Sequence, residues 1–241
     1  MNRIQLLLVA LVAASCGGST SQPTQMQPTA VTTAIGITLP SVLRAGESVQ
    51  ATATATLSNG EGKLLATGWQ SDATAVATVT NGGLVTGVAN GVVTISVTSD
   101  GIRGSKSIRV VPSYHGAWNG SYRVDRCTPF PSPVYSQFCN GYAPGTVLPL
   151  SFTFSQNGEV VDGQFIAGGL VSSAYVAAIN RDGGVEIKGT NSTNPYSSEF
   201  TWALAVPTPG RIAGIVALRR TGSSGLVGGA DVEGTIVSLA Q

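Results

Sequence analysis

Residues 49–57 read Val-Gln-Ala-Thr-Ala-Thr-Ala-Thr-Leu, so apolar and polar side chains alternate along the whole stretch. A period of two places one set of side chains on each face of an extended chain, and the stretch therefore predicts a single β-strand with one buried face. Shorter runs of the same kind follow at 75–79, 92–98 and 105–111, and the turn formers Asn59-Gly60 and Asn81-Gly82 stand between runs. Turn signals at such intervals predict an antiparallel β-sandwich without helices over residues 34–112.

Four motifs follow one another inside this segment. They are Gly68-Trp69-Gln70-Ser71-Asp72, Ala75-Val76-Ala77-Thr78-Val79, Gly83-Leu84-Val85-Thr86-Gly87-Val88 and Gly91-Val92-Val93-Thr94-Ile95. The series resembles the group 2 bacterial immunoglobulin-like domain (BIG2). The resemblance implies an Ig-like sandwich that serves as a spacer or adhesive module on bacterial surface proteins, without catalytic activity. We expect Trp69 in the core between the sheets, because a strand tryptophan in a sandwich is usually buried. The alternative, a sugar-stacking role, would need an exposed ring.

Residues 113–241 contain a second set of strand candidates. They lie at 116–126, 147–155, 159–166, 170–180, 185–190, 199–206, 211–220 and 231–239. Leu150, Phe152 and Phe154 alternate with polar residues, and Asn157-Gly158 is a strong hairpin signal. Eight successive strands predict an all-β, antiparallel, eight-stranded barrel closed by pairing the last strand with the first. An open sandwich made of the same strands is the alternative.

Gly116-Ala117-Trp118, together with Arg219 and Arg220, resembles the calycin pattern of lipocalins. The resemblance implies that Trp118 packs under one of the arginines as a barrel closure, and that the barrel has a cavity for a small apolar ligand. A barrel filled by its own side chains is the other interpretation of the same strands.

The N-terminus carries a targeting signal over residues 1–15. Arg3 precedes an apolar run at 4–14, which is too short to span a bilayer. Ala13-Ala14-Ser15-Cys16 resembles the lipobox of bacterial lipoproteins, with Ala13 where leucine is usual. The resemblance implies that Cys16 is fatty-acylated, with palmitate among the acyl chains, and becomes the mature N-terminus. Gly17, in place of aspartate, implies the outer membrane.

An ordinary secretory signal followed by a chance cysteine is the alternative to the lipobox. Residues 16–33 contain no charge and no periodic apolar pattern, and they predict a flexible tether after the lipidated cysteine.

Cys127 and Cys139 lie in a proline-rich connection between the first two barrel strands. In an exported protein two cysteines this close are expected to form a disulfide. The aromatic residues in or beside this connection are Phe130, Tyr135, Phe138 and Tyr142. They form a candidate ligand rim, or alternatively a plug that caps one end of the barrel.

Composition excludes several classes of function. Thirteen basic and 12 acidic residues give a net charge of +1, which argues against nucleic-acid binding through bulk charge. His115 is the single histidine, and the sequence contains no nucleophile elbow, phosphate-binding loop or histidine-rich metal motif. We therefore expect no enzyme activity, no cofactor and no metal. A hydrolase would need a carboxylate pair drawn from Asp162, Asp182, Glu186, Asp231 and Glu233.

These observations together predict a lipid-anchored protein of the bacterial cell envelope, at the periplasmic face or the cell surface. Its partners are the membrane, through the N-terminal lipid, and an envelope glycan or protein. The alternative is a carrier of a small apolar ligand in the C-terminal barrel.

Overall fold

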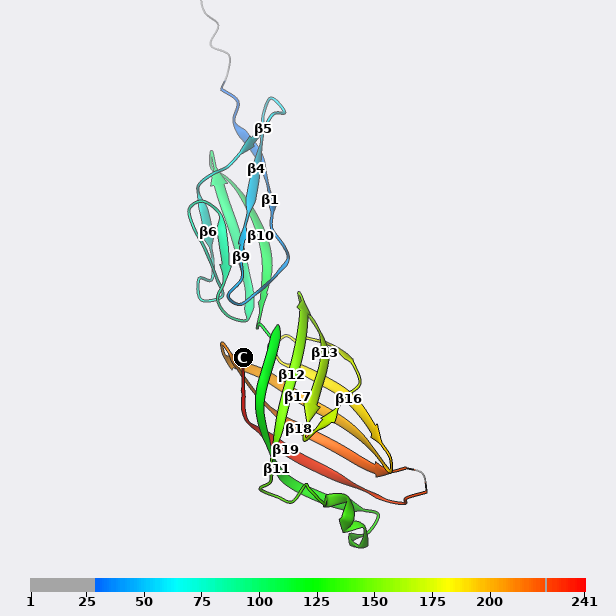
Figure 1. Ribbon diagram of the computed structural model, residues 1–241. Coiled ribbons are helices and arrows are strands. Elements are labelled where there is room, and N and C mark those ends of the chain that lie inside the picture. The colour runs from blue at the N-terminus through cyan, green and yellow to red at the C-terminus, as the bar shows by residue number, and fades with distance from the viewer. Residues whose placement is uncertain (1–28, 224) are drawn as a thin grey trace, which may run out of the picture. The chain divides into compact units, whose positions relative to one another are not determined.

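The computed structural model describes residues 29–223 and 225–241, which form β-strands and one short helix (Figure 1). The predicted signal segment, Cys16 and most of the predicted tether lie outside the described residues. The first strand begins at Thr32, within the segment predicted as tether. In the part of the chain that the structure describes, no helix has the length and apolar character needed to cross a membrane.

The first ten strands form the Ig-like part of the chain. They are β1 (Thr32–Thr38), β2 (Val42–Arg44), β3 (Ser48–Gln50), β4 (Thr52–Leu57), β5 (Gly62–Leu64), β6 (Trp69–Ser71), β7 (Ala77–Val79), β8 (Leu84–Gly87), β9 (Gly91–Ser99) and β10 (Ile102–Val111). They pair in the orders β1-β4-β5, β2-β10-β9-β6 and β3-β8-β7. All of these pairs are antiparallel except β2 and β10, which run parallel, so the purely antiparallel prediction was wrong there.

The stretch 49–57, predicted as one strand, is two strands that pair in different sheets. β3 pairs with β8 and β4 pairs with β1, and between them the amide of Ala51 donates to the carbonyl of Gly83 at 2.8 Å. The predicted alternation of burial is nevertheless continuous, since Ala51, Ala53 and Ala55 are all buried. Alternation reports which face a side chain occupies, but it carries no information about which strand lies alongside.

Trp69 lies in the Ig-like core, as predicted, with 6% of its surface exposed. Gly83 comes close to its ring: a Cβ at this position would lie 2.9 Å from the indole carbon Cε2. Gly83 also has φ +84°, which favours glycine. A turn in this sequence therefore shapes the pocket that holds the tryptophan.

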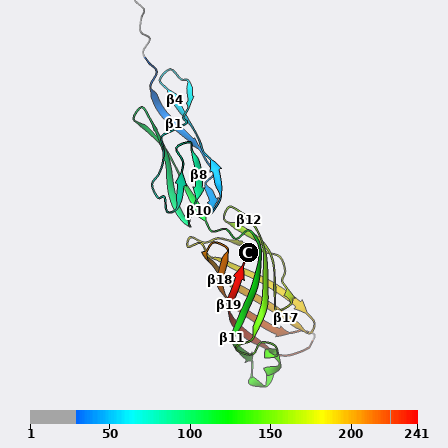
Figure 2. The same ribbon diagram turned by 60° about the vertical axis from the view of Figure 1, so that its left-hand side comes forward.

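The remaining strands form the barrel. They are β11 (Gly116–Phe130), β12 (Val147–Asn157), β13 (Val160–Ala167), β14 (Leu170–Val171), β15 (Tyr175–Ala178), β16 (Val185–Thr193), β17 (Tyr196–Thr208), β18 (Arg211–Gly222) and β19 (Gly229–Ala240). The 3₁₀ helix η1 (Pro133–Cys139) lies in the connection from β11 to β12. Figure 2 shows β11, β19 and β18 side by side, in agreement with their hydrogen-bonded order.

The last strand pairs with the first, as predicted, from Asn119 opposite Ala240 to Phe130 opposite Gly229. The predicted fourth strand is divided into β14 and β15, which both pair with β13. Between them, the hydroxyl of Ser172 accepts a hydrogen bond from the amide of Phe165 at 3.0 Å. The seam of the barrel lies between this divided strand and β16, where Ile179 and Val185 form an isolated bridge. The result is a nearly closed, eight-stranded antiparallel barrel.

Aromatic rings from several strands fill the barrel interior. Phe165 and Trp202 lie 5.7 Å apart between centroids, and Phe152 contacts both rings at 5.3 and 5.4 Å. The rings of this cluster are at most 4% exposed; they belong to Trp118, Tyr122, Phe152, Phe154, Phe165, Tyr175, Phe200 and Trp202. Because interiors pack to the density of organic crystals, these rings make the barrel interior a core rather than an open chamber.

Candidate functional site

Cys127 and Cys139 form a disulfide, which confirms the predicted pairing; their Cα atoms are 5.9 Å apart. Cys127 lies near the end of β11 and Cys139 is the last residue of η1. The bond fastens the long connection between β11 and β12 to the barrel wall.

The four aromatic residues predicted as a ligand rim divide into two pairs. Phe138 and Tyr142 are 0% and 5% exposed, and the Phe138 ring meets the Tyr196 ring edge-on at 5.5 Å. Burial raises the pKa of the Tyr142 hydroxyl. Phe130 and Tyr135 are half-buried. This burial favours the interpretation of the connection as a plug for one end of the barrel.

Two arginines cover ring faces at this end of the barrel. The guanidinium of Arg219 lies 4.5 Å from the centre of the Phe130 ring, and that of Arg220 lies 3.8 Å from the centre of the Tyr196 ring. Arg220 also lies 5.5 Å from the ring of Tyr142. Sugar recognition by stacking needs an uncovered ring face, so these cation–π contacts argue against a glycan platform here.

Trp118 is not brought together with Arg219 or Arg220. Trp118 lies near the start of β11, opposite Phe152. Arg219 is opposite Asp231 on β19, and Asp231 is in turn opposite Thr128, near the other end of β11. The indole nitrogen of Trp118 instead donates to the carbonyl of Tyr114 at 2.6 Å. The closure implied by the lipocalin resemblance is therefore not formed, because the register separates its members by most of a strand.

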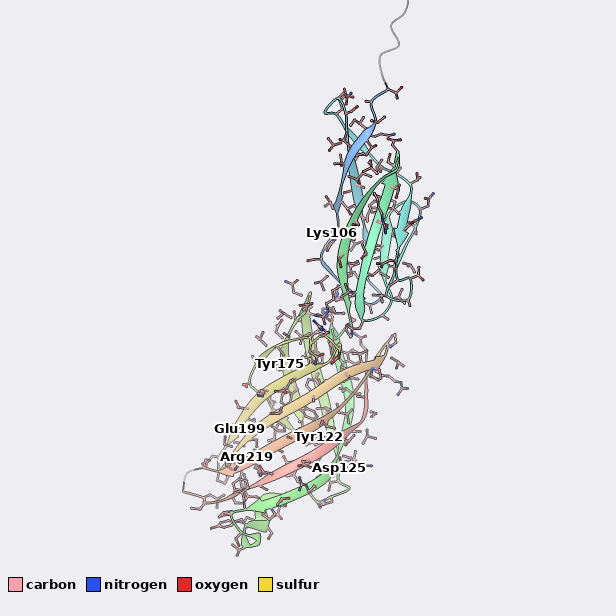
Figure 3. All side chains as sticks on the ribbon, turned by 180° about the vertical axis from the view of Figure 1, so that it is seen from behind. Lys106, Tyr122, Asp125, Tyr175, Glu199 and Arg219 are labelled. Atoms are coloured by element: carbon pink, nitrogen blue, oxygen red, sulfur yellow. A yellow bond between two sulfur atoms is a disulfide. The ribbon has the colours of Figure 1, made fainter. Side chains whose placement is uncertain are left out.

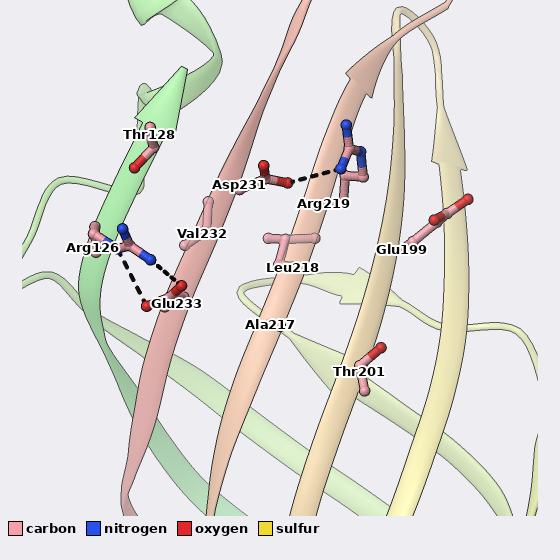
Figure 4. A pocket seen from close by; sticks show the side chains of 10 residues that line it. All are labelled: Arg126, Thr128, Glu199, Thr201, Ala217, Leu218, Arg219, Asp231, Val232 and Glu233. Atoms are coloured by element: carbon pink, nitrogen blue, oxygen red, sulfur yellow. Dashed lines mark hydrogen bonds and ion pairs between the residues drawn. The ribbon is translucent and has the colours of Figure 1, made fainter. Parts of the chain in front are cut away.

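A hollow lined by five charged side chains lies on the outer surface of the barrel, with a volume of about 440 Å³ (Figure 4). Its outward-facing residues occupy two adjacent rows across β11, β19, β18 and β17, and both rows continue beyond the hollow onto β16. One row is Arg126, Glu233, Ala217, Thr201 and Lys188. The other row is Thr128, Asp231, Arg219, Glu199 and Thr190. We call this hollow the outer groove. Ala217 lies at its centre, and its outward-facing residues are Arg126, Glu233, Ala217 and Thr201 in the first row and Thr128, Asp231, Arg219 and Glu199 in the second.

Side-chain size explains why the surface is hollowed at this place. Ala217 supplies a methyl group in the middle of the first row, while longer side chains stand around it (Figure 4). Arg126 and Glu233 are hydrogen-bonded through two nitrogens, and Arg219 lies 3.6 Å from Asp231. Glu199 makes no ion pair among the described residues, although Figure 3 places it beside Arg219. The groove thus offers a small apolar floor inside a ring of both charges.

Two of the five acidic residues considered for a carboxylate pair meet in the outer groove. Asp231 and Glu233 project from the same face of β19, while Asp162 lies on β13 and Asp182 lies in the turn after β15. Glu186 belongs to the next row, opposite Ala203. Among residues 29–223 and 225–241, no three His, Cys, Asp or Glu side chains are placed to hold a metal ion. His115 is exposed.

The sequence analysis missed Glu199, Arg126 and Ala217. The sequence did indicate that these three side chains point outward, because each lies at an outward-facing position of a strand in which buried and exposed residues alternate. Only the register, which no single strand reveals, shows that they surround one hollow.

Residues 31–110 match the family model of the bacterial Ig-like domain, group 2. A search of curated proteins found no match. Among solved structures, the S-type phycobiliprotein lyase CPES from Guillardia theta is 10% identical, with 52% of this chain and 88% of that chain covered and a TM-score of 0.26. Domains 5–6 of the S-layer protein SbsC are 18% identical, with 85% and 97% covered and a TM-score of 0.30. The chain therefore contains a bacterial Ig-like domain at residues 31–110, followed by a nearly closed, eight-stranded antiparallel barrel.

Proposed function

We propose that this chain is a lipid-anchored protein of the bacterial cell envelope, held in the outer membrane through Cys16. In this proposal the Ig-like domain is a spacer and the barrel makes non-catalytic contacts through its outer groove. The observation that carries the contact role is the contrast between a barrel interior filled by its own rings and a charged hollow on its outer face. The Cys127–Cys139 disulfide supports an oxidising location outside the cytosol.

The groove suits binding better than hydrolysis. A general acid is usually a carboxyl group kept protonated by apolar surroundings. Asp231 and Glu233 are instead exposed, and each contacts an arginine. These contacts fit a surface that recognises another polar surface.

The carrier alternative receives less support. Tyr122 and Trp202 each have a buried polar atom without a hydrogen-bond partner in the described part of the chain, which a bound molecule would satisfy. Both rings nevertheless pack against their neighbours, with 5.5 Å between their own centroids. We therefore place ligand contact on the outside of the barrel.

Fractionation of bacterial cells that express the full chain tests the anchor. We expect the protein in the outer-membrane fraction with label from radioactive palmitate, and we expect Cys16→Ser to remove both the label and the membrane association. Thr20→Ala, which changes a neighbouring tether residue, should leave both unchanged. An unlabelled parent chain in the cytosol would refute the location.

Native mass spectrometry of the extracted chain tests the mode of action. We expect the mass of the polypeptide and its acyl chains, without a further small molecule. A stoichiometric apolar compound that is retained by the parent chain and lost in Trp202→Ala would instead establish the carrier function.

A further inference from the structure

Four alanines and one isoleucine line the centre of the outer face of β17 and β18. Ala203 and Ala205 on β17 are exposed, as are Ala213 and Ala217 on β18. Ile215, between these two alanines of β18, is 60% exposed. Val237 on the neighbouring β19 is 58% exposed. Small apolar residues on two adjacent strands allow another surface to approach the sheet closely.

Charged side chains flank this apolar centre on the outer rows. In one row, Glu233 on β19 and Lys188 on β16 stand on either side of Ala217 and Thr201. In the next row, Arg219 on β18 is directly opposite Glu199 on β17. The side chains of Arg219 and Lys188 are 55% and 73% exposed, and their ion pairs, with Asp231 and Glu186, lie at the surface. Because exposed ion pairs are weak, both cations can also engage a partner's carboxylate.

We propose that this face binds the same face of a second copy of the chain, around a two-fold axis that runs parallel to the strands and midway between β17 and β18. Such an axis places each β18 residue opposite the β17 residue with which it is in register, and each β19 residue opposite its β16 counterpart. The proposal names the partner of the outer groove and therefore rests on the proposed contact function.

The register makes this face complementary to itself in charge. Arg219 of each copy faces Glu199 of the other copy, which makes no ion pair within the described chain. Glu233 faces Lys188 of the other copy, because both are level with the Ala217–Thr201 pair. All four contacts join opposite charges, which specifies both partner and register.

The apolar positions are complementary under the same axis. Ile215 faces Ala203 of the second copy, and Ala213 faces Ala205. Two convex barrels touch first along the axis, where Ile215 of each copy packs against Ala203 of the other, and they diverge toward β16 and β19. The long side chains of Glu233 and Lys188 stand where the gap widens and can bridge it.

The size of the face predicts a weak dimer. Four strands about 4.8 Å apart, over roughly six residues of rise, give a flat area of about 400 Å² per copy. Stable interfaces bury about 800 Å² per partner, so the association belongs to the transient class.

Cross-linking of the full chain tests the proposal. Ala203→Cys places a thiol beside the two-fold axis, where a short bismaleimide reaches the same residue of the second copy. We expect a covalent dimer from this variant in detergent extracts. Neither the parent chain nor Val176→Cys should give one, because Val176 is 77% exposed on β15, which lies beyond β16 and outside the proposed face.

Charge reversal then tests the register. In the Ala203→Cys background, Arg219→Glu should lower the cross-linked fraction at least about fivefold, and so should Glu199→Arg, because each places like charges opposite one another. The two changes together should restore it. Asp162→Lys, on the opposite wall, should have no effect, and circular dichroism should show every variant folded.

Equal cross-linking of Ala203→Cys and Val176→Cys would overturn the proposal, and so would a double reversal that fails to restore the dimer. A cross-link from Ala203→Cys to a different protein would also overturn it. A chain that is acylated at the outer membrane yet gives no dimer would contradict only this inference and leave the envelope function standing.

Discussion

Removal of the Cys127–Cys139 disulfide by the double change Cys127→Ser and Cys139→Ser should destabilise the barrel by about 3 kcal/mol. The two cysteines are 12 positions apart. In the chain-entropy description, opening a loop of about 13 residues returns roughly 10 cal/mol/K to the unfolded chain, or about 3 kcal/mol at room temperature. For a folded unit of roughly 130 residues this corresponds to a fall of about 10 °C in melting temperature.

Two features of the connection modify that magnitude. Three prolines, at positions 129, 131 and 133, already restrict the unfolded loop and reduce the effect. Phe138 and Tyr142 belong to the same connection and are buried, so their exposure on loss of the disulfide would increase the destabilisation. A loss above about 5 kcal/mol would therefore indicate that the plug itself detaches, since burial of one such ring contributes about 1.5–3 kcal/mol.

Urea unfolding followed by circular dichroism measures this effect. The parent chain under reducing conditions should match the double serine variant, and Cys16→Ser should leave the free energy of unfolding unchanged. A difference below about 1 kcal/mol between the oxidised parent and the double variant would refute the entropic reasoning, because closing a loop of this length is worth several times more.

Three further predictions concern the two cores. In chemical unfolding, Gly83→Ala should destabilise the Ig-like domain by about 1–3 kcal/mol more than the control Gly60→Ala. Both glycines have positive φ, but only at Gly83 would an added Cβ meet the Trp69 ring, so equal losses in the two variants would contradict the steric reasoning. Tyr122→Phe should change the free energy of unfolding by less than about 0.5 kcal/mol, because the Tyr122 hydroxyl has no hydrogen-bond partner in the described chain, whereas Tyr114→Phe should lower it by about 1 kcal/mol, because the Tyr114 hydroxyl donates to the carbonyl of Gly183 at 2.9 Å. Equal losses in the two variants would contradict this difference in hydrogen bonding. Finally, burial raises the pKa of four barrel tyrosines, so above about pH 10 these groups ionise first in the unfolded chain, and the free energy of unfolding should fall by about 1.4 kcal/mol per pH unit for each of them. Urea titrations at rising pH, together with tyrosinate absorbance, measure this fall, and a free energy of unfolding that does not change with pH would contradict the prediction. The four are Tyr114, Tyr122, Tyr142 and Tyr175.

The contacts of the aromatic loop show where local pattern stops being informative. Its sequence places Phe130, Tyr135, Phe138 and Tyr142 close together along the chain, which is compatible with a rim or a plug. Phe138 packs against Tyr196 and Tyr142 lies under Arg220, and both partners come from strands more than fifty residues away. Exposure is set by such distant neighbours, so no inspection of the loop alone could choose between the two.

Alternation along single strands was sufficient to predict an all-β chain with two β-rich segments. The count of eight successive strands predicted the pairing of the last barrel strand with the first, and the closeness of the two cysteines in an exported chain predicted the disulfide. The phase of neighbouring side chains and short separations in sequence are local properties, whereas the first-to-last pairing follows from the general rule that a barrel closes on itself. Tertiary structure alone decided that residues 49–57 change sheets at Ala51, that Trp118 lies far from Arg219, and that Glu199 and Ala217 share a groove. These are matters of register between strands, and register is set by packing across the whole sheet rather than by the sequence of any one strand.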